Sequence, residues 1–125
     1  MGLVLASASP RRRELLAALG VPFEVDPAEI EEPLPERHPH PERVARRLAR
    51  HKAEVVAARR PEDWILAADT VVVLRGRLLG KPETPEEARA MLRSLRDRWH
   101  RVITGVAVAH GKRLRVDHAQ TWVRI

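Results

Sequence analysis

The pattern of apolar and polar positions predicts alternating strands and helices from the start of the chain. An apolar run at residues 3 to 6 predicts a strand, and a helix follows from Pro10 to just before Gly20. Ser9 suits the N-cap, and Pro10 suits the first helical position because its missing N–H would be unpaired there. Gly20 suits the left-handed position after the last turn. We therefore expect a strand, a short loop and a helix.

The next segment predicts a short strand and a long irregular loop. Residues 21 to 25 are expected to form a strand near a sheet edge, because Pro22 cannot donate to a strand ladder. Residues 24 to 42 hold seven acids and five prolines, which favours an extended loop.

A longer helix is predicted from about Pro41 to Arg59, with Val44, Leu48 and Val55 on its apolar face, helped by Ala45 and Ala53. Lys52 follows Leu48 by four residues, so it lies at the border of that face. On spacing alone, a lysine that reaches past the apolar surface to solvent is the simpler interpretation.

Residues 64 to 74 are almost continuously apolar, which predicts two short strands or one bent strand buried on both faces. Asp69 lies in the middle of this run. A buried carboxylate is costly unless a cation or several donors compensate it. Asp69 is therefore either a structural hydrogen-bonding residue or a functional carboxylate.

The remainder of the chain predicts a hairpin, a helix and a second hairpin. A turn is expected at residues 75 to 77, and Thr84 with Glu87 predicts a capping box with Pro85 at the first helical position. That helix is expected to bury Ala88, Met91, Leu92 and Leu95. Residues 99 to 110 and 113 to 125 predict two strands joined at Gly111. The sum is an α/β protein with a central mixed β-sheet flanked by helices, in one domain over residues 1 to 125.

The composition limits which functional groups and which cellular locations the chain can use. The chain has no cysteine, which excludes disulfides, zinc-thiolate sites and thiol nucleophiles. It has no apolar run of membrane-spanning length and no signal-peptide pattern, so we expect a cytoplasmic protein that does not enter a membrane. His100 is expected to be a packed or surface strand residue rather than a ligand.

The net charge of +6 favours anionic partners. Nucleic acid is the weaker candidate, because the chain has one Phe, three Trp and no Tyr for base stacking. Three arginines, Arg11 to Arg13, stand at the start of the first helix, where acids are normally favoured. A basic run is often a solvated surface, but a strand-to-helix junction is also where open α/β sheets bind phosphate.

Four motifs in order carry a specific resemblance: residues 5 to 12 (LASASPRR), 47 to 53 (RLARHKA), 68 to 72 (ADTVV) and 80 to 82 (GKP). With them, the chain resembles the Maf-like nucleotide pyrophosphatases, also called septum formation inhibitor proteins. The arginine pair directly after Pro10, together with Asp69-Thr70, resembles the branch that acts on dTTP and UTP. Members continue beyond a point equivalent to Ile125, so the resemblance implies a C-terminally shortened member.

The resemblance implies the fold, the activity and the roles of the site residues. It implies a nucleotide-binding cleft, hydrolysis of a nucleoside triphosphate to the monophosphate and pyrophosphate, and a divalent cation, Mg²⁺ or Mn²⁺. Asp69 would accept a proton, and Glu32 and Asp69 would lie near the metal. The substrate-binding residues would be Ser7, Arg11, Arg12, Lys52, Thr70 and Lys81, of which Arg11 and Thr70 match positions used for base selectivity.

The sequence leaves two alternative interpretations of the function open. The chain could be a nucleotide-binding protein without turnover that acts in cell division, or a small nucleic-acid-binding module. A long final strand at the edge of the sheet is a template for another chain, so we also expect a homodimer.

Overall fold

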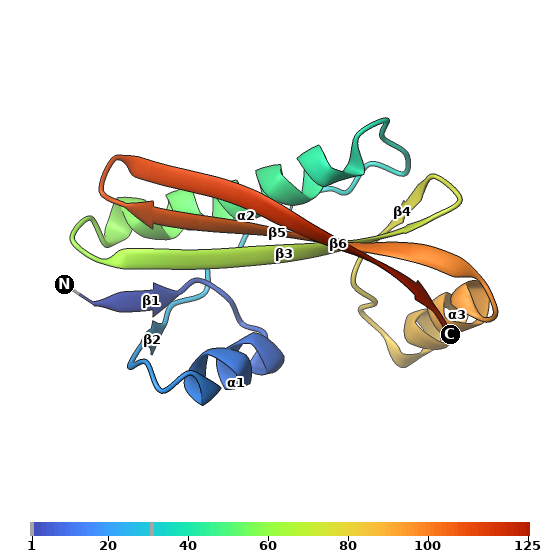
Figure 1. The fold of residues 1–125 in the computed structure, drawn as a ribbon, viewed down its shortest axis with the longest axis horizontal. Coiled ribbons are helices and arrows are strands. Elements are labelled where there is room, and N and C mark those ends of the chain that lie inside the picture. Colours follow the sequence, from blue (N-terminus) through green and yellow to red (C-terminus); the bar gives the residue numbers. More distant parts are fainter. Residues whose placement is uncertain (1, 31) are drawn as a thin grey trace.

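The structure, a computed structural model, describes residues 2–30 and 32–125. Within them a six-stranded mixed sheet runs in the order β2-β1-β3-β5-β6, with β4 paired to β3 (Figure 1). The strands are β1 (Leu3–Leu5), β2 (Glu24–Val25), β3 (Trp64–Leu74), β4 (Arg77–Leu79), β5 (Trp99–His110) and β6 (Arg113–Arg124). The helices are α1 (Pro10–Ala18), α2 (Pro41–Arg59) and α3 (Pro85–Leu95). The predicted α/β class with a mixed sheet is confirmed.

The central strand β3 has one edge that is only partly paired. β5 follows its other edge from Trp64 to Val73. On the remaining edge, β1 runs parallel to the first three residues, and β4 pairs in the antiparallel sense with Val72 to Leu74. Residues 67 to 71 therefore lie between the end of β1 and the end of β4, and no strand of the described chain lies beside them on that edge. This open segment contains Asp69 and Thr70.

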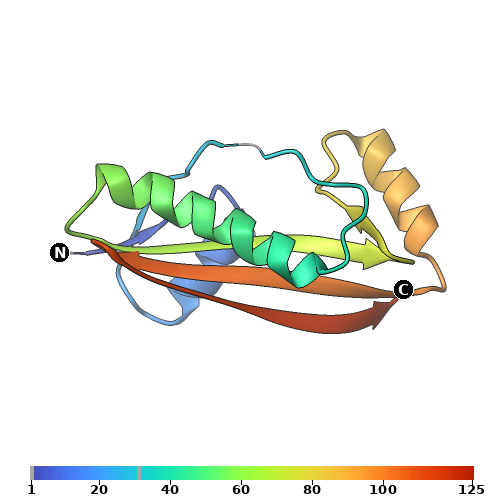
Figure 2. The same ribbon diagram turned by 90° about the horizontal axis from the view of Figure 1, so that it is seen from above.

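Helix α2 covers one face of the sheet (Figure 2). The buried side chains of β3 that face it are Ile65, Ala67, Val71 and Val73. Burial along β3 thus alternates, and the expectation of a strand buried on both faces is wrong. The other side of β3 is only half-buried, because the described residues place no helix directly across it. On α2 itself, Val44, Ala45, Leu48 and Ala53 are buried as predicted, whereas Val55 is half-buried against the core and Val56 is fully buried.

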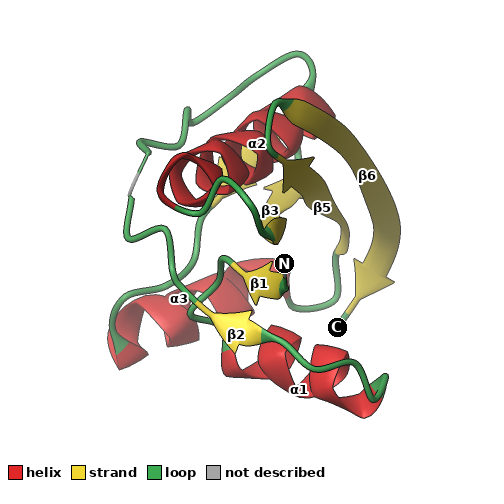
Figure 3. Cartoon of the chain, turned by 90° about the vertical axis from the view of Figure 1, so that its left-hand side faces the viewer, coloured by secondary structure: helices red, strands yellow, loops and turns green. Residues whose placement is uncertain are grey.

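The other two helices lie on the opposite side of the sheet and apart from each other, α1 beneath β1 and α3 near the ends of β3 and β4 (Figures 1 and 3). Helix α1 buries no residue completely. Helix α3 buries only Leu95, while Ala88 and Met91 are half-buried and Leu92 is 56% exposed. The prediction therefore overestimated how many side chains α3 buries. The helix lies at the rim of the sheet, and within the described residues no layer packs over it.

Local signals in the sequence placed the element ends well. Ser9 caps α1 by accepting from the Arg12 backbone N–H, and Gly20 follows with φ of 74°. Thr84 caps α3 through the Glu87 N–H, while the Glu87 carboxylate accepts from the Glu83 N–H rather than from Thr84. The first hairpin turns at Arg75 and Gly76, both with positive φ. The edge strand β2 is confirmed but has two residues only, and β6 ends at Arg124.

Two further expectations concern His100 and the helices. His100 is 3% exposed and its ring contacts the carbonyl of Arg98, so it is a packed strand residue as expected. Among the described helices, none has both the length and the apolarity needed to cross a bilayer.

Candidate active site

The open segment of β3 borders two adjoining hollows. One is a cleft of about 800 Å³ on the side of α1 and α3, and the other, about 730 Å³, lies on the side of α2. They share the residues Lys52, Asp69, Thr70, Gly80, Lys81 and Pro82. The hollows meet here because successive side chains of a strand point to opposite faces, and no neighbouring strand closes the gap. Both faces of β3 therefore contribute to one site.

Asp69 points to the α2 side, where its carboxylate meets Lys52. Lys52 Nζ lies 2.7 Å from Asp69 Oδ2, and the Thr70 backbone N–H donates to Asp69 Oδ1 at 2.9 Å. The side chains of Lys52 and Asp69 are 27% and 21% exposed. Lys52 thus lies in the site rather than reaching to open solvent. A carboxylate with an ammonium group and an amide donor is compensated in a half-buried position.

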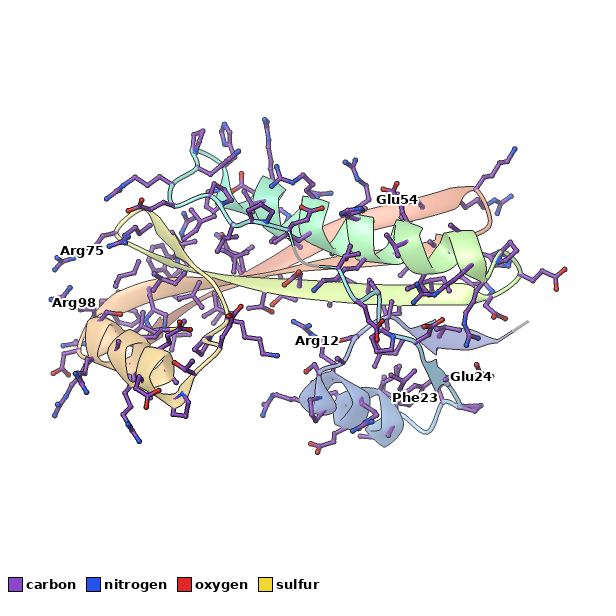
Figure 4. The ribbon with its side chains drawn as sticks, turned by 180° about the vertical axis from the view of Figure 1, so that it is seen from behind. Arg12, Phe23, Glu24, Glu54, Arg75 and Arg98 are labelled. Carbon is purple, nitrogen blue, oxygen red and sulfur yellow. The ribbon has the colours of Figure 1, made fainter. Side chains whose placement is uncertain are left out.

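Arg12 connects α1 to the open segment from the other face. Its guanidinium donates to the Ala68 carbonyl at 3.2 Å and to Thr70 Oγ1 at 2.8 Å. Figure 4 shows the labelled Arg12 between α1 and β3. The missing neighbour strand leaves the Ala68 carbonyl free for this contact. Two of the five N–H donors of a guanidinium are used here, and the others are available to a ligand.

The remaining predicted contacts come from the loop after β1, from α1 and from the segment after β4. Ser7 is almost buried, and its Oγ accepts from the Ser9 N–H at 3.2 Å, which shapes the turn into α1. Arg11 and Lys81 are exposed side chains that line the cleft. The structure therefore brings Ser7, Arg11, Arg12, Lys52, Asp69, Thr70 and Lys81 to one cleft.

Glu32 lies in the second hollow together with Asp69. Its carboxylate contacts the His51 ring and lies 3.6 Å from Arg47 Nε, so both partners come from α2. The neighbouring Glu31 lies outside the described residues. Across residues 2–30 and 32–125, no three His, Asp or Glu side chains gather as a ready metal site. Two carboxylates on one hollow nevertheless fit Mg²⁺, which usually takes one or two carboxylates plus substrate phosphates and water.

Two site residues were not singled out by the sequence. Thr104 of β5 lines the cleft, and its hydroxyl lies 3.0 Å from Thr70 Oγ1. His51 holds Glu32. The available signal for Thr104 was a polar residue within the otherwise apolar stretch from residue 102 to 109. The strand pairing that places it beside Thr70 is a long-range contact that no local pattern reveals.

A half-open mixed sheet with a cleft of this size, bordered by cations and one paired carboxylate, defines the molecule as an α/β protein with a basic cleft. Two solved structures share the fold. One is a nucleoside-triphosphatase, or dITP/XTP pyrophosphatase, from Mycobacterium abscessus, and the other is the Ham1 protein of Staphylococcus aureus. Each has a TM-score of 0.63 and 16% identity, and covers all of this chain, which in turn covers 74% and 72% of theirs.

The chain belongs to the Maf-like protein family, which it matches over residues 2–125. It is 78% identical over 98% of its length to a dTTP/UTP pyrophosphatase of Thermomicrobium roseum, 58% over 86% to one of Myxococcus xanthus, and 47% over 99% to one of Thermotoga maritima. It covers 56%, 54% and 60% of those proteins. The chain therefore spans little more than half the length of these relatives.

Proposed function

We propose that this protein hydrolyses dTTP and UTP to the nucleoside monophosphate and pyrophosphate. The observation that carries the proposal is the Lys52–Asp69 pair, set on the open segment of β3 and bordered by further cations of the cleft. The close relatives named for that activity support the choice of nucleotides. Because the chain spans only part of their length, the activity is proposed for this chain and not carried over with the family.

The cleft suits the charge of a triphosphate. A nucleoside triphosphate carries about four negative charges, and further negative charge develops on the leaving pyrophosphate during hydrolysis. Arg11, Arg12, Lys52 and Lys81 enter the cleft from three different elements, so they can meet phosphate oxygens from several directions. Ser7 lies at the turn into α1, where backbone N–H groups also face a ligand.

We assign Asp69 the role of general base. A water oxygen bonds to the α-phosphorus, the bond between that phosphorus and the oxygen bridging to the β-phosphorus breaks, and a proton of the water passes to the Asp69 carboxylate. Lys52, at 2.7 Å, holds that carboxylate in place before the reaction. Its positive charge also lies close to the phosphate chain. Pyrophosphate leaves with the bonding electrons of the broken bond.

Glu32 and Asp69 are the residues that would hold a divalent metal ion, since they border the same hollow. When bound, Mg²⁺ or Mn²⁺ supplies positive charge for phosphate oxygens and makes water easier to deprotonate. Glu32 is pre-positioned for such a role by His51 and Arg47.

Pyrophosphate release from a panel of nucleoside triphosphates, with Mg²⁺ or Mn²⁺, tests the proposal. We expect turnover of dTTP and UTP that stops when EDTA removes the metal. Nucleotide binding without any pyrophosphate release would overturn the catalytic assignment. It would support the alternative of a non-catalytic nucleotide-binding protein in cell division. Binding to DNA with steep salt dependence and no nucleotide preference would contradict both.

We also propose that the protein acts as a cytoplasmic homodimer. A substrate from the free nucleotide pool fits that location. The dimer is supported by β6, a twelve-residue strand at the edge of the sheet in the described chain, and by exposed apolar side chains along it such as Trp122. An unprotected edge of this length is a template for a second strand.

A further inference from the structure

Thr104 lies opposite Thr70 across the β3–β5 ladder, on the sheet face turned away from α2. The two hydroxyl oxygens are 3.0 Å apart, and both side chains are half-buried in the wall of the cleft. Thr70 borders both hollows, whereas Thr104 borders only the cleft on the α1 side. Thr70 is therefore the member of the pair that belongs to the open segment of β3, where the two hollows meet.

The number of donors and acceptors at Thr70 limits what it can offer a ligand. A hydroxyl has one proton and two acceptor lone pairs, and a guanidinium can only donate. Arg12 Nη2 donates to Thr70 Oγ1 at 2.8 Å and so occupies one of its lone pairs. If Thr104 donates to the second lone pair, Thr70 can act toward a ligand only as a donor. Without that contact, Thr70 can either donate or accept.

Apart from the Arg12 guanidinium, which donates to Thr70, the surroundings of the pair suit the base of a nucleotide better than its phosphates. The cleft wall near them is apolar, with Leu16, Val72, Met91 and Val106. Lys52, which pairs with Asp69, and Lys81 lie toward the shared part of the two hollows. A planar, uncharged ring with a few polar atoms at its edge fits an apolar wall that carries two hydroxyl groups.

We propose that Thr104 is a positioning residue for base selection: it donates to Thr70, so that Thr70 can only donate to the bound base. A base that offers a carbonyl oxygen at this point is accepted, and one that offers an amino group is disfavoured. Uracil and thymine carry a carbonyl where cytosine carries an amino group. Thr104 thus favours uracil and thymine nucleotides over cytosine nucleotides without touching the base. This inference rests on the proposed function, because it needs the nucleotide base at the Thr70 end of the cleft.

The test measures equilibrium binding, so it does not depend on turnover. The probes are the α,β-imido analogues of UTP and CTP, in which an NH group replaces the oxygen that bridges the α- and β-phosphorus atoms. Wild-type protein is expected to prefer the UTP analogue. In Thr104→Val, which keeps the shape and strand preference of threonine, the ratio of the two dissociation constants is expected to fall about five- to tenfold. The fall comes from tighter binding of the CTP analogue, because the freed lone pair of Thr70 can accept from the amino group.

Thr104→Ser keeps the hydroxyl and is expected to keep the wild-type ratio. Thr121→Val removes the same group from the same sheet face in β6, away from the cleft, and is expected to change nothing. If Thr104→Val fails to fold, Thr104→Ala removes the same hydroxyl with less bulk.

The outcomes separate this inference from the proposed function. Equal weakening of both analogues in Thr104→Val would show a purely structural residue, and an unchanged ratio would show that Thr104 plays no part in selection. A wild-type protein that binds both analogues equally would also overturn the inference, while pyrophosphate release from UTP would still support the proposed activity. Wild-type protein that binds neither analogue would overturn both.

Discussion

Asp69 affects both the proposed chemistry and the stability of the fold. It occupies the middle of the central strand, yet the missing neighbour strand on one edge gives it a half-buried rather than a fully buried place. Lys52 and the Thr70 N–H compensate its charge. The sequence left open whether such an aspartate is structural or functional, and its position on the shared border of two hollows favours function.

Asp69→Asn tests this assignment. The amide keeps the shape of the side chain but cannot accept a proton, so we expect pyrophosphate release to fall by at least about 100-fold. The free energy of unfolding is expected to change by less than about 1 kcal/mol, because a partly exposed ion pair contributes little. The measurements are initial rates with dTTP and a thermal melt.

Asp117→Asn is the matched control, since Asp117 is an exposed residue of β6 that does not border the cleft. It should leave both the rate and the melting temperature unchanged. An Asp69→Asn protein that melts much earlier and yet retains its activity would make Asp69 a structural residue.

At the scale of elements, two contacts fix helix α2. The N-terminal part of the helix packs against the sheet at Gly105, where a Cβ would lie 2.2 Å from the Ala45 carbonyl oxygen. Gly105 pairs with Asp69, so this close approach also sets the height of Lys52 above the carboxylate. The C-terminal end of α2 is held by Arg59 and Arg60, which bind Asp26 beside β2.

Gly105→Ala should push α2 away from the sheet, because the added methyl group meets backbone atoms that cannot turn aside. We expect a loss of about 1 to 3 kcal/mol in the free energy of unfolding, measured by urea denaturation. Gly2→Ala is the control, since its nearest neighbour would be 3.9 Å away. Equal stability of the Gly105→Ala and wild-type proteins would mean that α2 does not pack as closely as the structure places it.

The Asp26 cluster predicts a stability that depends on pH. Hydrogen bonds from Arg59 and then Arg60 lower the pKa of Asp26 from 3.8 to about 2. A carboxyl group with a lowered pKa in the folded state stabilises the fold above its ordinary pKa, and this contribution is lost as the pH falls from 3.8 toward 2.

Asp26→Asn is therefore expected to reduce the free energy of unfolding by about 1 to 2 kcal/mol at pH 7, a range that allows for screening of the exposed arginines. Most of the difference from the wild type should be lost near pH 2, as measured by urea titrations at both pH values. Glu62→Gln, on an exposed residue, serves as the control. A difference that persists unchanged at pH 2 would show that the charge of Asp26 is not its cause.

At the scale of the whole molecule, the described chain leaves one long edge and one broad face uncovered. The edge is β6, and the face is the side of β3 and β5 that α2 does not cover. Helix α1 carries Leu15 and Leu19 at 59% and 73% exposure on that side. Exposed apolar surface next to an open strand edge favours association with another chain.

Light scattering at micromolar concentration is expected to give twice the chain mass, with partial dissociation on dilution. Trp122→Lys introduces a charge on β6 where a tryptophan is 59% exposed, and it should shift the equilibrium toward monomer. Ala58→Lys, which adds the same charge at an exposed position of helix α2 rather than on β6, is the control. A monomeric wild-type protein that stays soluble on storage would show that 125 residues cover their own core well enough.

The sequence by itself determined the order, type and most boundaries of the elements. Caps and turns depend on neighbouring residues, so Ser9, Thr84 and Gly76 marked element ends that the structure confirms. Four ordered motifs were also enough to indicate the family. They named residues that the structure places around one cleft: two of the motifs stand where β1 and β4 end, and the other two lie within α2 and β3.

Only the tertiary structure decided which surfaces are covered and which groups pair. Whether an apolar strand or helix is buried on one face or two depends on where other elements pack. The hydrophobic patterns of β3 and α3 therefore predicted more buried side chains than the structure has. The contact of Lys52 with Asp69, and that of Thr104 with Thr70, join residues 17 and 34 positions apart in the chain. Such contacts depend on the crossing of α2 and on the register of β5, and both result from packing of the whole chain rather than from any local pattern.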